Sequence, residues 1–195
     1  MYVRDAKNRD EAWLLDHIES MGLDEAAFRS RDYVIAVDEE TDERTGFGRL
    51  RVHKTDDGDV CELTGIGVLE QWRGQGVGAH VIERLVEIAG DQGFDTVYSI
   101  TGEHEYLAQF GFDPLEADRL PGRIAERLDR KREAVDPDSV AMAVDVGGFH
   151  MPPRLREAFK EAAPRESTDD AEPEEVAEDF GIDTENATYK YDTGS

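Results

Sequence analysis

Several residue types and patterns are scarce in this sequence of 195 residues. Cys61 is the only cysteine, which excludes an internal disulfide framework and a thiolate zinc cluster. There is no HExxH motif, and His17, His53, His80 and His150 lack metal-ligand spacing, so we expect no metal. No apolar run approaches the roughly 18 residues of a membrane span, and the first ten residues lack the apolar region of a signal peptide. We therefore expect a soluble, cytoplasmic protein.

Positive charge is also scarce, because 22 Lys+Arg stand against 46 Asp+Glu and give a net charge of −24. Such a field repels phosphate backbones and anionic headgroups, so we expect no nucleic-acid or membrane partner. Only 5 of the basic residues are lysine. This composition resembles that of halophilic proteins, in which molar salt shortens the Debye length to about 3 Å and screens the repulsion. An acidic protein of an ordinary cytoplasm is the alternative.

The charge divides the chain into two parts. Residues 161–195 hold 12 acidic and 2 basic residues and few large apolar ones. That composition predicts an acidic, largely disordered tail, with a short helix at 174–180 left open. We therefore place the folded domain at residues 1–160.

Hydrophobic periodicity alternates between strand and helix within residues 1–160. Strands are expected at 2–5, 32–37, 46–53, 60–68, 95–101, 112–115 and 139–146. Helices are expected at 14–21, after a glycine-rich turn with an apolar stripe of Ile82, Leu85, Val86 and Ala89, and at 103–110 and 123–133. This order predicts an α/β fold with a central sheet, in which the early strands form hairpins and the later ones alternate with helices.

The glycine-rich turn is the most informative stretch. Gly74, Gly76 and Gly78 occupy every second position of the turn that joins a predicted strand to a predicted helix. In such a turn, backbone N–H groups and the N-terminus of the helix favour the binding of anions. Residues 71–82 contain no Asp or Glu, and Arg73 is their one formal charge. The turn is therefore a candidate phosphate site. The alternative is a tight turn whose small residues serve helix packing.

Two ligand classes compete for this turn. Gly74, Gly76 and Ala79 satisfy G-x-G-x-x-A, a dinucleotide fingerprint. That motif normally follows the first strand directly, whereas three predicted strands precede it here, and Glu103 lies too far along the chain for the ribose acid. A dinucleotide site is therefore disfavoured.

The segment Gln71-Trp72-Arg73-Gly74-Gln75-Gly76 matches the Q/R-x-x-G-x-G/A signature of the GCN5-related N-acetyltransferases (GNAT). The stretch YLAQFGF at 106–112 resembles the aromatic-rich helix ending in Gly-Phe of that family. The resemblance extends over residues 1–146. It implies a mixed, mostly antiparallel central sheet flanked by helices.

The resemblance also implies a function: transfer of an acetyl group from acetyl-CoA to a primary amine, through a ternary complex with a small-molecule acceptor. In the family, backbone amides of the signature turn bind the pyrophosphate, and the end of the preceding strand binds the pantetheine arm and polarises the acetyl carbonyl. The turn residues are Arg73, Gly74, Gln75, Gly76, Val77, Gly78 and Ala79, and the strand residues are Ile66, Gly67 and Val68.

Glu62 is the candidate base that takes the proton of the acceptor amine, because many relatives carry a glutamate on this strand. A period of two places Glu62, Thr64, Ile66 and Val68 on one face, with Thr64 toward the substrate and Cys61 in the core behind. The alternative is that Glu62 is one more acid of an acid-rich chain.

Tyr106 is the candidate acid for the leaving thiolate, although Leu107 stands where many relatives have tyrosine. A shift of one residue turns a side chain by about 100° on a helix, so His104 and solvent remain alternatives.

Residues 119–132 form a basic island with six bases and two acids. On a helix, Arg123, Arg127 and Arg130 share one face. Arg123 and Arg127 are candidate ligands of a carboxylate-bearing substrate or of the CoA phosphates. A salt-bridged face is the alternative. A non-catalytic acyl-CoA-binding module also stays open as a function, and a homodimer stays open as an assembly.

Overall fold

The structure is a computed structural model that describes residues 1–166. Seven strands form one sheet in the order β1-β2-β3-β4-β5-β7-β6. The strands are β1 (Tyr2–Asp5), β2 (Tyr33–Val37), β3 (Arg44–His53), β4 (Val60–Val68), β5 (Thr96–Thr101), β6 (Asp113–Pro114) and β7 (Val140–Asp145). Only β4 and β5 run parallel, and all other neighbours are antiparallel. The expected mixed, mostly antiparallel sheet is confirmed, and a doubly wound parallel sheet for a dinucleotide is excluded.

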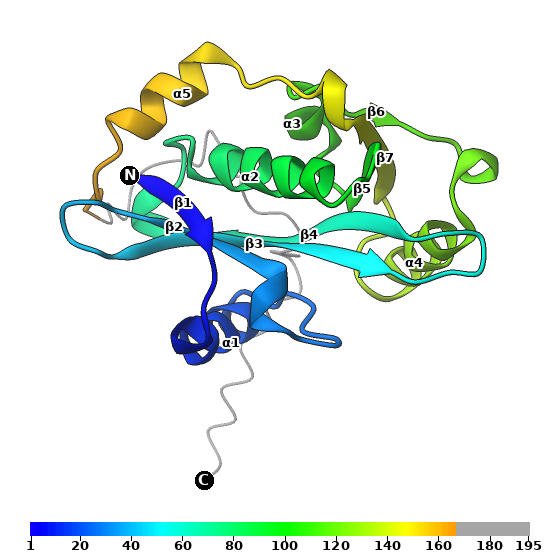
Figure 1. Cartoon of the computed structure of the whole chain (residues 1–195), viewed down its shortest axis with the longest axis horizontal. Coiled ribbons are helices and arrows are strands. Elements are labelled where there is room, and N and C mark those ends of the chain that lie inside the picture. Colours follow the sequence, from blue (N-terminus) through cyan, green and yellow to red (C-terminus); the bar gives the residue numbers. More distant parts are fainter. Residues whose placement is uncertain (167–195) are drawn as a thin grey trace, which may run out of the picture.

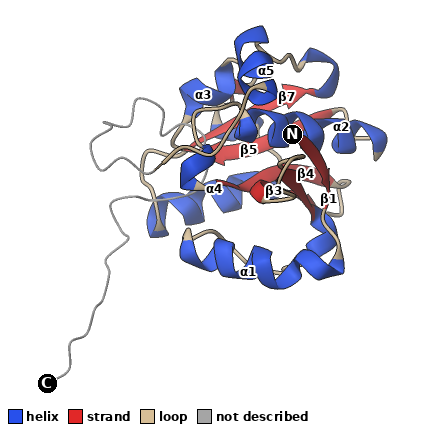
Figure 2. Cartoon of the chain, turned by 90° about the vertical axis from the view of Figure 1, so that its left-hand side faces the viewer, coloured by secondary structure: helices blue, strands red, loops and turns tan. Residues whose placement is uncertain are grey.

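Helices cover both faces of this sheet (Figure 1). They are α1 (Glu11–Ser20), α2 (Val77–Asp91), α3 (His104–Ala108), α4 (Gly122–Ala134) and α5 (Pro153–Lys160). Figure 2 shows α2, α3 and α5 above the sheet and α1 and α4 below it. Within residues 1–166, no helix is long and apolar enough to cross a bilayer.

The largest core cluster lies between α2 and the sheet. The expected stripe of α2 (Ile82, Leu85, Val86, Ala89) is buried there. Gly48 of β3 permits this close packing, because a Cβ at Gly48 would lie 2.5 Å from Ile66 Cδ1 and 2.6 Å from Val81 Cγ1. The crossing of α2 over β3 therefore fixes where the helix begins relative to the end of β4.

A β-bulge in β4 changes which residues face the same way. Phe47 pairs with Gly67 but Arg49 pairs with Thr64, so two residues of β4 stand opposite Gly48. Gly65 takes a left-handed φ of +61° at this point.

The bulge makes one sequence expectation wrong. Ile66 and Val68 join Cys61 in the core beneath α2, whereas Glu62 and Thr64 line a cavity. The four residues expected on one face are split between two, because the extra residue shifts the alternation. Cys61 is fully buried, as expected.

Helix α5 was not expected from the sequence. Its two buried residues, Leu155 and Phe159, are spaced by one helical turn. Phe159 stacks on His80 of α2, with ring centroids 3.8 Å apart. Residues 161–166 continue from α5. The remainder of the expected tail, 167–195, and its optional helix lie outside the described residues, and the domain boundary at 160 stays a prediction.

Asp10 ties the first strand and α1 to the sheet. Its fully buried carboxylate accepts hydrogen bonds from Arg4 of β1 (2.7 and 3.1 Å), from Arg44 of β3 (2.8 Å) and from the backbone N–H of Lys7 (2.8 Å). Burial alone would raise the pKa of Asp10, but the bonds from Arg4, Lys7 and Arg44 outweigh it and hold the pKa well below its ordinary value.

We expect Asp10→Asn to lower the free energy of unfolding by about 2–3 kcal/mol at pH 7, because two partly buried guanidinium groups lose their counter-ion. Because the pKa of Asp10 is lowered by folding, its carboxylate stabilises the fold fully when the pH is above the ordinary aspartate pKa near 4. This stabilisation is lost as the pH falls below that value. The gap between wild type and variant should therefore narrow in acid.

Urea unfolding at pH 7 and below pH 4 measures this gap. Asp5→Asn is the control, because Asp5 pairs with Arg84 at 3.2 Å on the surface, where such a pair contributes about 0–1 kcal/mol. Equal losses in the two variants would contradict the role assigned to Asp10.

Candidate active site

Strands β4 and β5 separate at the middle of the sheet. Their parallel pairing covers three residue pairs and ends at Leu63 with Ser99. Beyond it, β4 continues to Val68 and pairs only with β3 on its other side. The β5-facing edge of residues 64–68 therefore offers backbone groups to a bound molecule.

The glycine-rich turn begins directly after this edge. Gly74 and Gly76 have φ values of +68° and +76°, which favour glycine, and α2 starts at Val77. The Arg73 guanidinium donates to the carbonyl of Val68 at 3.1 Å and closes the turn onto the strand end. The structure thus brings the predicted strand-end and turn residues together at the N-terminus of one helix, an arrangement that suits a phosphate group.

Helix α5 and the residues after it support the turn. A Cβ on Gly76 would lie 2.4 Å from the carbonyl oxygen of Leu155. The Gln75 side chain donates to the carbonyl of Ala163 (2.9 Å) and accepts from its N–H (3.0 Å). The N–H of Arg165 donates to the carbonyl of Gln71 at 2.9 Å. Gln75, expected to bind cofactor, therefore also fastens the C-terminal segment.

A cavity of about 460 Å³ opens on the face of the sheet that carries α1 and α4. Its size suits a small-molecule ligand. Its walls come from the segment after α1, from β3, β4 and β5, and from α4. The lining residues are Gly22, Leu23, Asp24, Ala26, Arg51, Glu62, Thr64, Gly65, Ile100, Arg127, Arg130, Lys131 and Val135.

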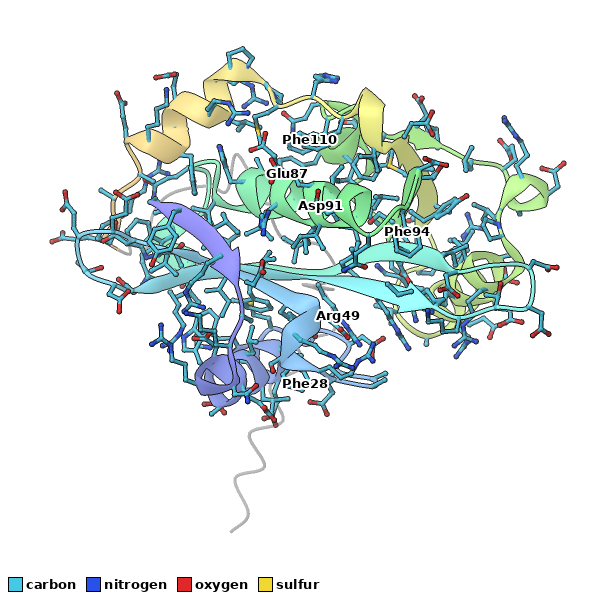
Figure 3. The ribbon with its side chains drawn as sticks, in the orientation of Figure 1. Phe28, Arg49, Glu87, Asp91, Phe94 and Phe110 are labelled. Atoms are coloured by element: carbon cyan, nitrogen blue, oxygen red, sulfur yellow. The ribbon has the colours of Figure 1, made fainter. Side chains whose placement is uncertain are left out.

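Arg49 holds the segment after α1 in place. Its side chain is 2% exposed, and its guanidinium donates to the carbonyls of Ala26 and Ala27, each at 2.8 Å. Figure 3 shows Arg49 and Phe28 on the α1 side of the sheet. One wall of the cavity is therefore anchored to β3.

Glu62 occupies the buried end of the cavity and is 1% exposed. The Nε and Nη2 atoms of Arg127 donate to its two oxygens at 2.5 and 3.1 Å, and His53 Nε2 lies 2.7 Å from Oε2. These bonds use three of the roughly four acceptor positions of a carboxylate. Burial pushes the pKa of Glu62 upward, but His53 and Arg127 outweigh it, so the pKa is lowered and the group is ionised at neutral pH.

The basic residues of the island at 119–132 have two different roles in the structure, because some line the cavity and others form salt bridges on the helix surface. Arg127 lines the cavity but is paired with Glu62. Arg123 is not among the lining residues and pairs with Glu126 of its own helix at 3.3 Å. Arg130 and Lys131 both line the cavity, although Arg130 is 62% exposed and also lies 3.9 Å from Glu126. The salt-bridged face therefore accounts for Arg123, and the cavity-facing cations are its neighbours along the helix.

Tyr106 lies on the opposite face of the sheet from the cavity. It packs at the edge of the core beneath α2, 5.3 Å from Phe110 in an edge-on arrangement, and Figure 3 shows Phe110 on that side. Leu107 is fully buried in the same core. His104 begins α3 and is exposed. A role for Tyr106 as the acid stays a prediction.

Sequence reasoning missed His53, Arg51 and Lys131. A signal for the first two was present, because the hairpin of β3 and β4 pairs His53 with Val60 and Arg51 with Glu62. If the hairpin register is set by the acidic turn at 54–59, Arg51 lies opposite Glu62, and the alternation of side chains along the strand places His53 on the same face. Lys131 carried no comparable signal, since its approach depends on how α4 packs.

The fold matches solved acetyltransferases. N-acetylglutamate synthase from Neisseria gonorrhoeae, complexed with coenzyme A and N-acetyl-glutamate, superposes with a TM-score of 0.60 at 17% identity over 74% of this chain. The chain spans only 34% of that enzyme. Rv2747 from Mycobacterium tuberculosis, in complex with CoA and NLQ, gives a TM-score of 0.60 at 18% identity over 74% of this chain and 99% of that one.

Aminoglycoside 6'-acetyltransferase type Ii gives a TM-score of 0.51 at 19% identity and covers 78% of this chain and 100% of its own. At these identities the likeness concerns the fold. The sequence model of the Acetyltransferase (GNAT) family matches residues 3–112, which is more than half of the chain and includes the signature turn. The chain is therefore a member of the GNAT acetyltransferase family.

Proposed function

We propose that this protein transfers the acetyl group of acetyl-CoA directly to a primary amine of a small molecule. The observation that carries the proposal is the junction at β4. The edge of β4 at residues 64–68, which does not pair with β5, leads into the glycine turn. The cavity that contains the buried, ionised Glu62 lies next to the same stretch of β4. Relatives of this fold have been solved with CoA.

The proposed cofactor contacts follow the strand into the helix. Backbone groups of Ile66, Gly67 and Val68 would hold the pantetheine arm, and the turn from Arg73 to Ala79 would hold the pyrophosphate. A backbone N–H near Val68 would polarise the thioester carbonyl and stabilise the oxyanion. An acidic side chain near the turn would repel the pyrophosphate, and residues 71–82 contain no Asp or Glu.

The proposed chemistry needs a proton acceptor before the attack, because an ammonium nitrogen has no lone pair. The amine nitrogen attacks the thioester carbon, the new C–N bond replaces the C–S bond, and the CoA thiolate leaves. Glu62 takes the ammonium proton, through a water where the amine does not reach the carboxylate. His53 and Arg127 orient Glu62 by their hydrogen bonds. The nitrogen loses its second proton to solvent as the amide forms, and Tyr106 or solvent returns a proton to the thiolate.

The test is release of CoA thiol from acetyl-CoA in the presence of a panel of amines, in molar KCl because the composition predicts a halophilic protein. We expect turnover with at least one primary amine and an N-acetylated product by mass spectrometry. Tight binding of acetyl-CoA without turnover across the panel would instead favour a non-catalytic acyl-CoA-binding module.

A further inference from the structure

The cavity carries more positive charge than its own carboxylates neutralise. Four cations line it, Arg51, Arg127, Arg130 and Lys131, against two carboxylates, Asp24 and Glu62. Glu62 is already shared between Arg127 and His53. In a chain with a net charge of −24, a surface hollow with an excess of cations indicates an anionic ligand.

We propose that the acceptor is a small amine that also bears a carboxylate, and that Arg51 and Lys131 bind this carboxylate. The inference rests on the proposed acetyl transfer, and it adds the chemical class of the acceptor. It assigns the binding of the anion to two residues that carry no part of the proton transfer.

Arg51 is largely buried but weakly paired. Its side chain is 14% exposed, and within residues 1–166 its one ion pair is to Asp24 at 3.5 Å, which is longer than a good charged hydrogen bond. Asp24 itself is 49% exposed and also lies 3.9 Å from Arg127. Burial lowers the pKa of Arg51, and the charges of Arg127 and Arg49 lower it further. A carboxylate beside Arg51 would relieve this repulsion.

Lys131 reaches the cavity from α4. Its ammonium donates to the carbonyl of Ile100 at 2.8 Å, and no ion pair to it is recorded in the described part of the chain. An ammonium has three donors, so two remain for a ligand. Burial lowers the pKa of Lys131, with Arg127 acting in the same direction and Glu62 and Asp136 against it.

The charge balance favours a carboxylate over a phosphate. Arg127 is neutralised by Glu62, and Arg130 is 62% exposed and lies 3.9 Å from Glu126. Arg51 and Lys131 carry two positive charges, and Asp24 supplies one negative charge, so one further negative charge neutralises this group. The rest of the wall includes apolar residues, Leu23, Ile100 and Val135, which suit a short carbon skeleton between the amine and the carboxylate.

Matched pairs of acceptors test the inference. We compare β-alanine with β-alaninamide, 4-aminobutanoate with 4-aminobutanamide, and 4-(aminomethyl)benzoate with its amide, so that each amide lacks any carboxylate, and include 2-aminoethyl phosphate. We expect at least one carboxylate to exceed its amide by about 30-fold in kcat/KM, because the amide leaves one positive charge of Arg51 and Lys131 without a counter-ion. A ratio below threefold in every pair that turns over would overturn the inference while the proposed function stands. A preference for 2-aminoethyl phosphate over β-alanine would overturn the carboxylate assignment.

Two variants assign the subsite to its residues. Arg51→Gln and Lys131→Met should each reduce the carboxylate-to-amide ratio to about threefold or less, with the KM for acetyl-CoA unchanged. Arg84→Gln is the control, since it removes the same charge from α2 on the opposite face, where Arg84 pairs with Asp5 and Glu87. Ratios that stay at the wild-type value in both variants would contradict the assignment.

A binding measurement separates this inference from the proposed function. Glutarate, which has no amine, should raise the thermal midpoint of the wild-type protein, and glutaramide should not. The shift should disappear in Arg51→Gln and persist in Arg84→Gln. If no amine is acetylated but the glutarate shift follows this pattern, the proposed function fails and the anion subsite stands. If amines are acetylated and glutarate gives no shift, the subsite fails alone.

Discussion

Replacing Glu62 with glutamine is expected to lower kcat for acetyl transfer by about 10²- to 10³-fold at neutral pH. The amide keeps the size of the side chain but accepts no proton from the acceptor ammonium. The KM for acetyl-CoA should change little, because Glu62 lies on the face of β4 away from Ile66 and Val68. Steady-state kinetics with the best acceptor of the panel measures both constants.

The pH profile separates a base from a structural residue. Because the pKa of Glu62 is lowered, the carboxylate is ionised throughout the neutral range and the acceptor amine sets the rise of activity with pH. At alkaline pH the amine arrives without its extra proton, so a base is no longer required. The deficit of Glu62→Gln should therefore shrink as the pH approaches the pKa of the amine. A deficit that stays constant across the pH range would contradict proton transfer to Glu62.

Stability needs its own control, because Glu62→Gln also removes the counter-ion of a partly buried arginine. A lowered carboxyl pKa stabilises the fold above the ordinary value near 4.5 and ceases to do so in acid, so the variant is less stable at neutral pH. Glu83→Gln is the matched variant, since Glu83 pairs with Arg156 at 2.7 Å away from the cavity. It should cost less stability and leave kcat unchanged.

The parts of the site that depend on local chain chemistry could be predicted from the sequence. Strand β4 has the expected boundaries, because an apolar run is bounded by Gly58 before it and the glycine turn after it. Helix α2 begins within that turn, since Gly74 and Gly76 supply the positive φ values that the chain needs there. The acid-free stretch at 71–82 likewise pointed to the turn without any knowledge of the fold.

The parts that depend on packing between distant segments could not be predicted. Strand β4 contains two glycines, Gly65 and Gly67, and the sequence does not say which of them takes part in the bulge. The bulge lies opposite Gly48 of β3, where α2 packs closely on the sheet. That bulge decides which side chains of β4 face the cavity. Helix α5 has only two buried residues, so the sequence gives little sign of it, and its position depends on the stacking of Phe159 on His80.

Gly76→Ala is expected to weaken acetyl-CoA binding by about 100-fold, which corresponds to about 2.7 kcal/mol. Two causes combine. A φ of +76° is unfavourable for alanine by about 1–2 kcal/mol. The new Cβ would also lie 2.4 Å from the carbonyl oxygen of Leu155, a backbone atom that cannot move without moving α5. The turn must change shape, and its N–H groups then no longer point to one place.

Gly93→Ala is the matched control for this variant, because it separates the two causes. Gly93 follows the other end of α2, has a φ of +87°, and has no atom within 4 Å of an added Cβ. It should lose only the conformational part of the stability, about 1 kcal/mol, and bind acetyl-CoA as the wild type does. Titration calorimetry with CoA and thermal unfolding measure the two quantities. Equal affinities in the two variants would mean that the contact between Gly76 and α5 does not shape the turn, and the phosphate site would then have to lie elsewhere along β4.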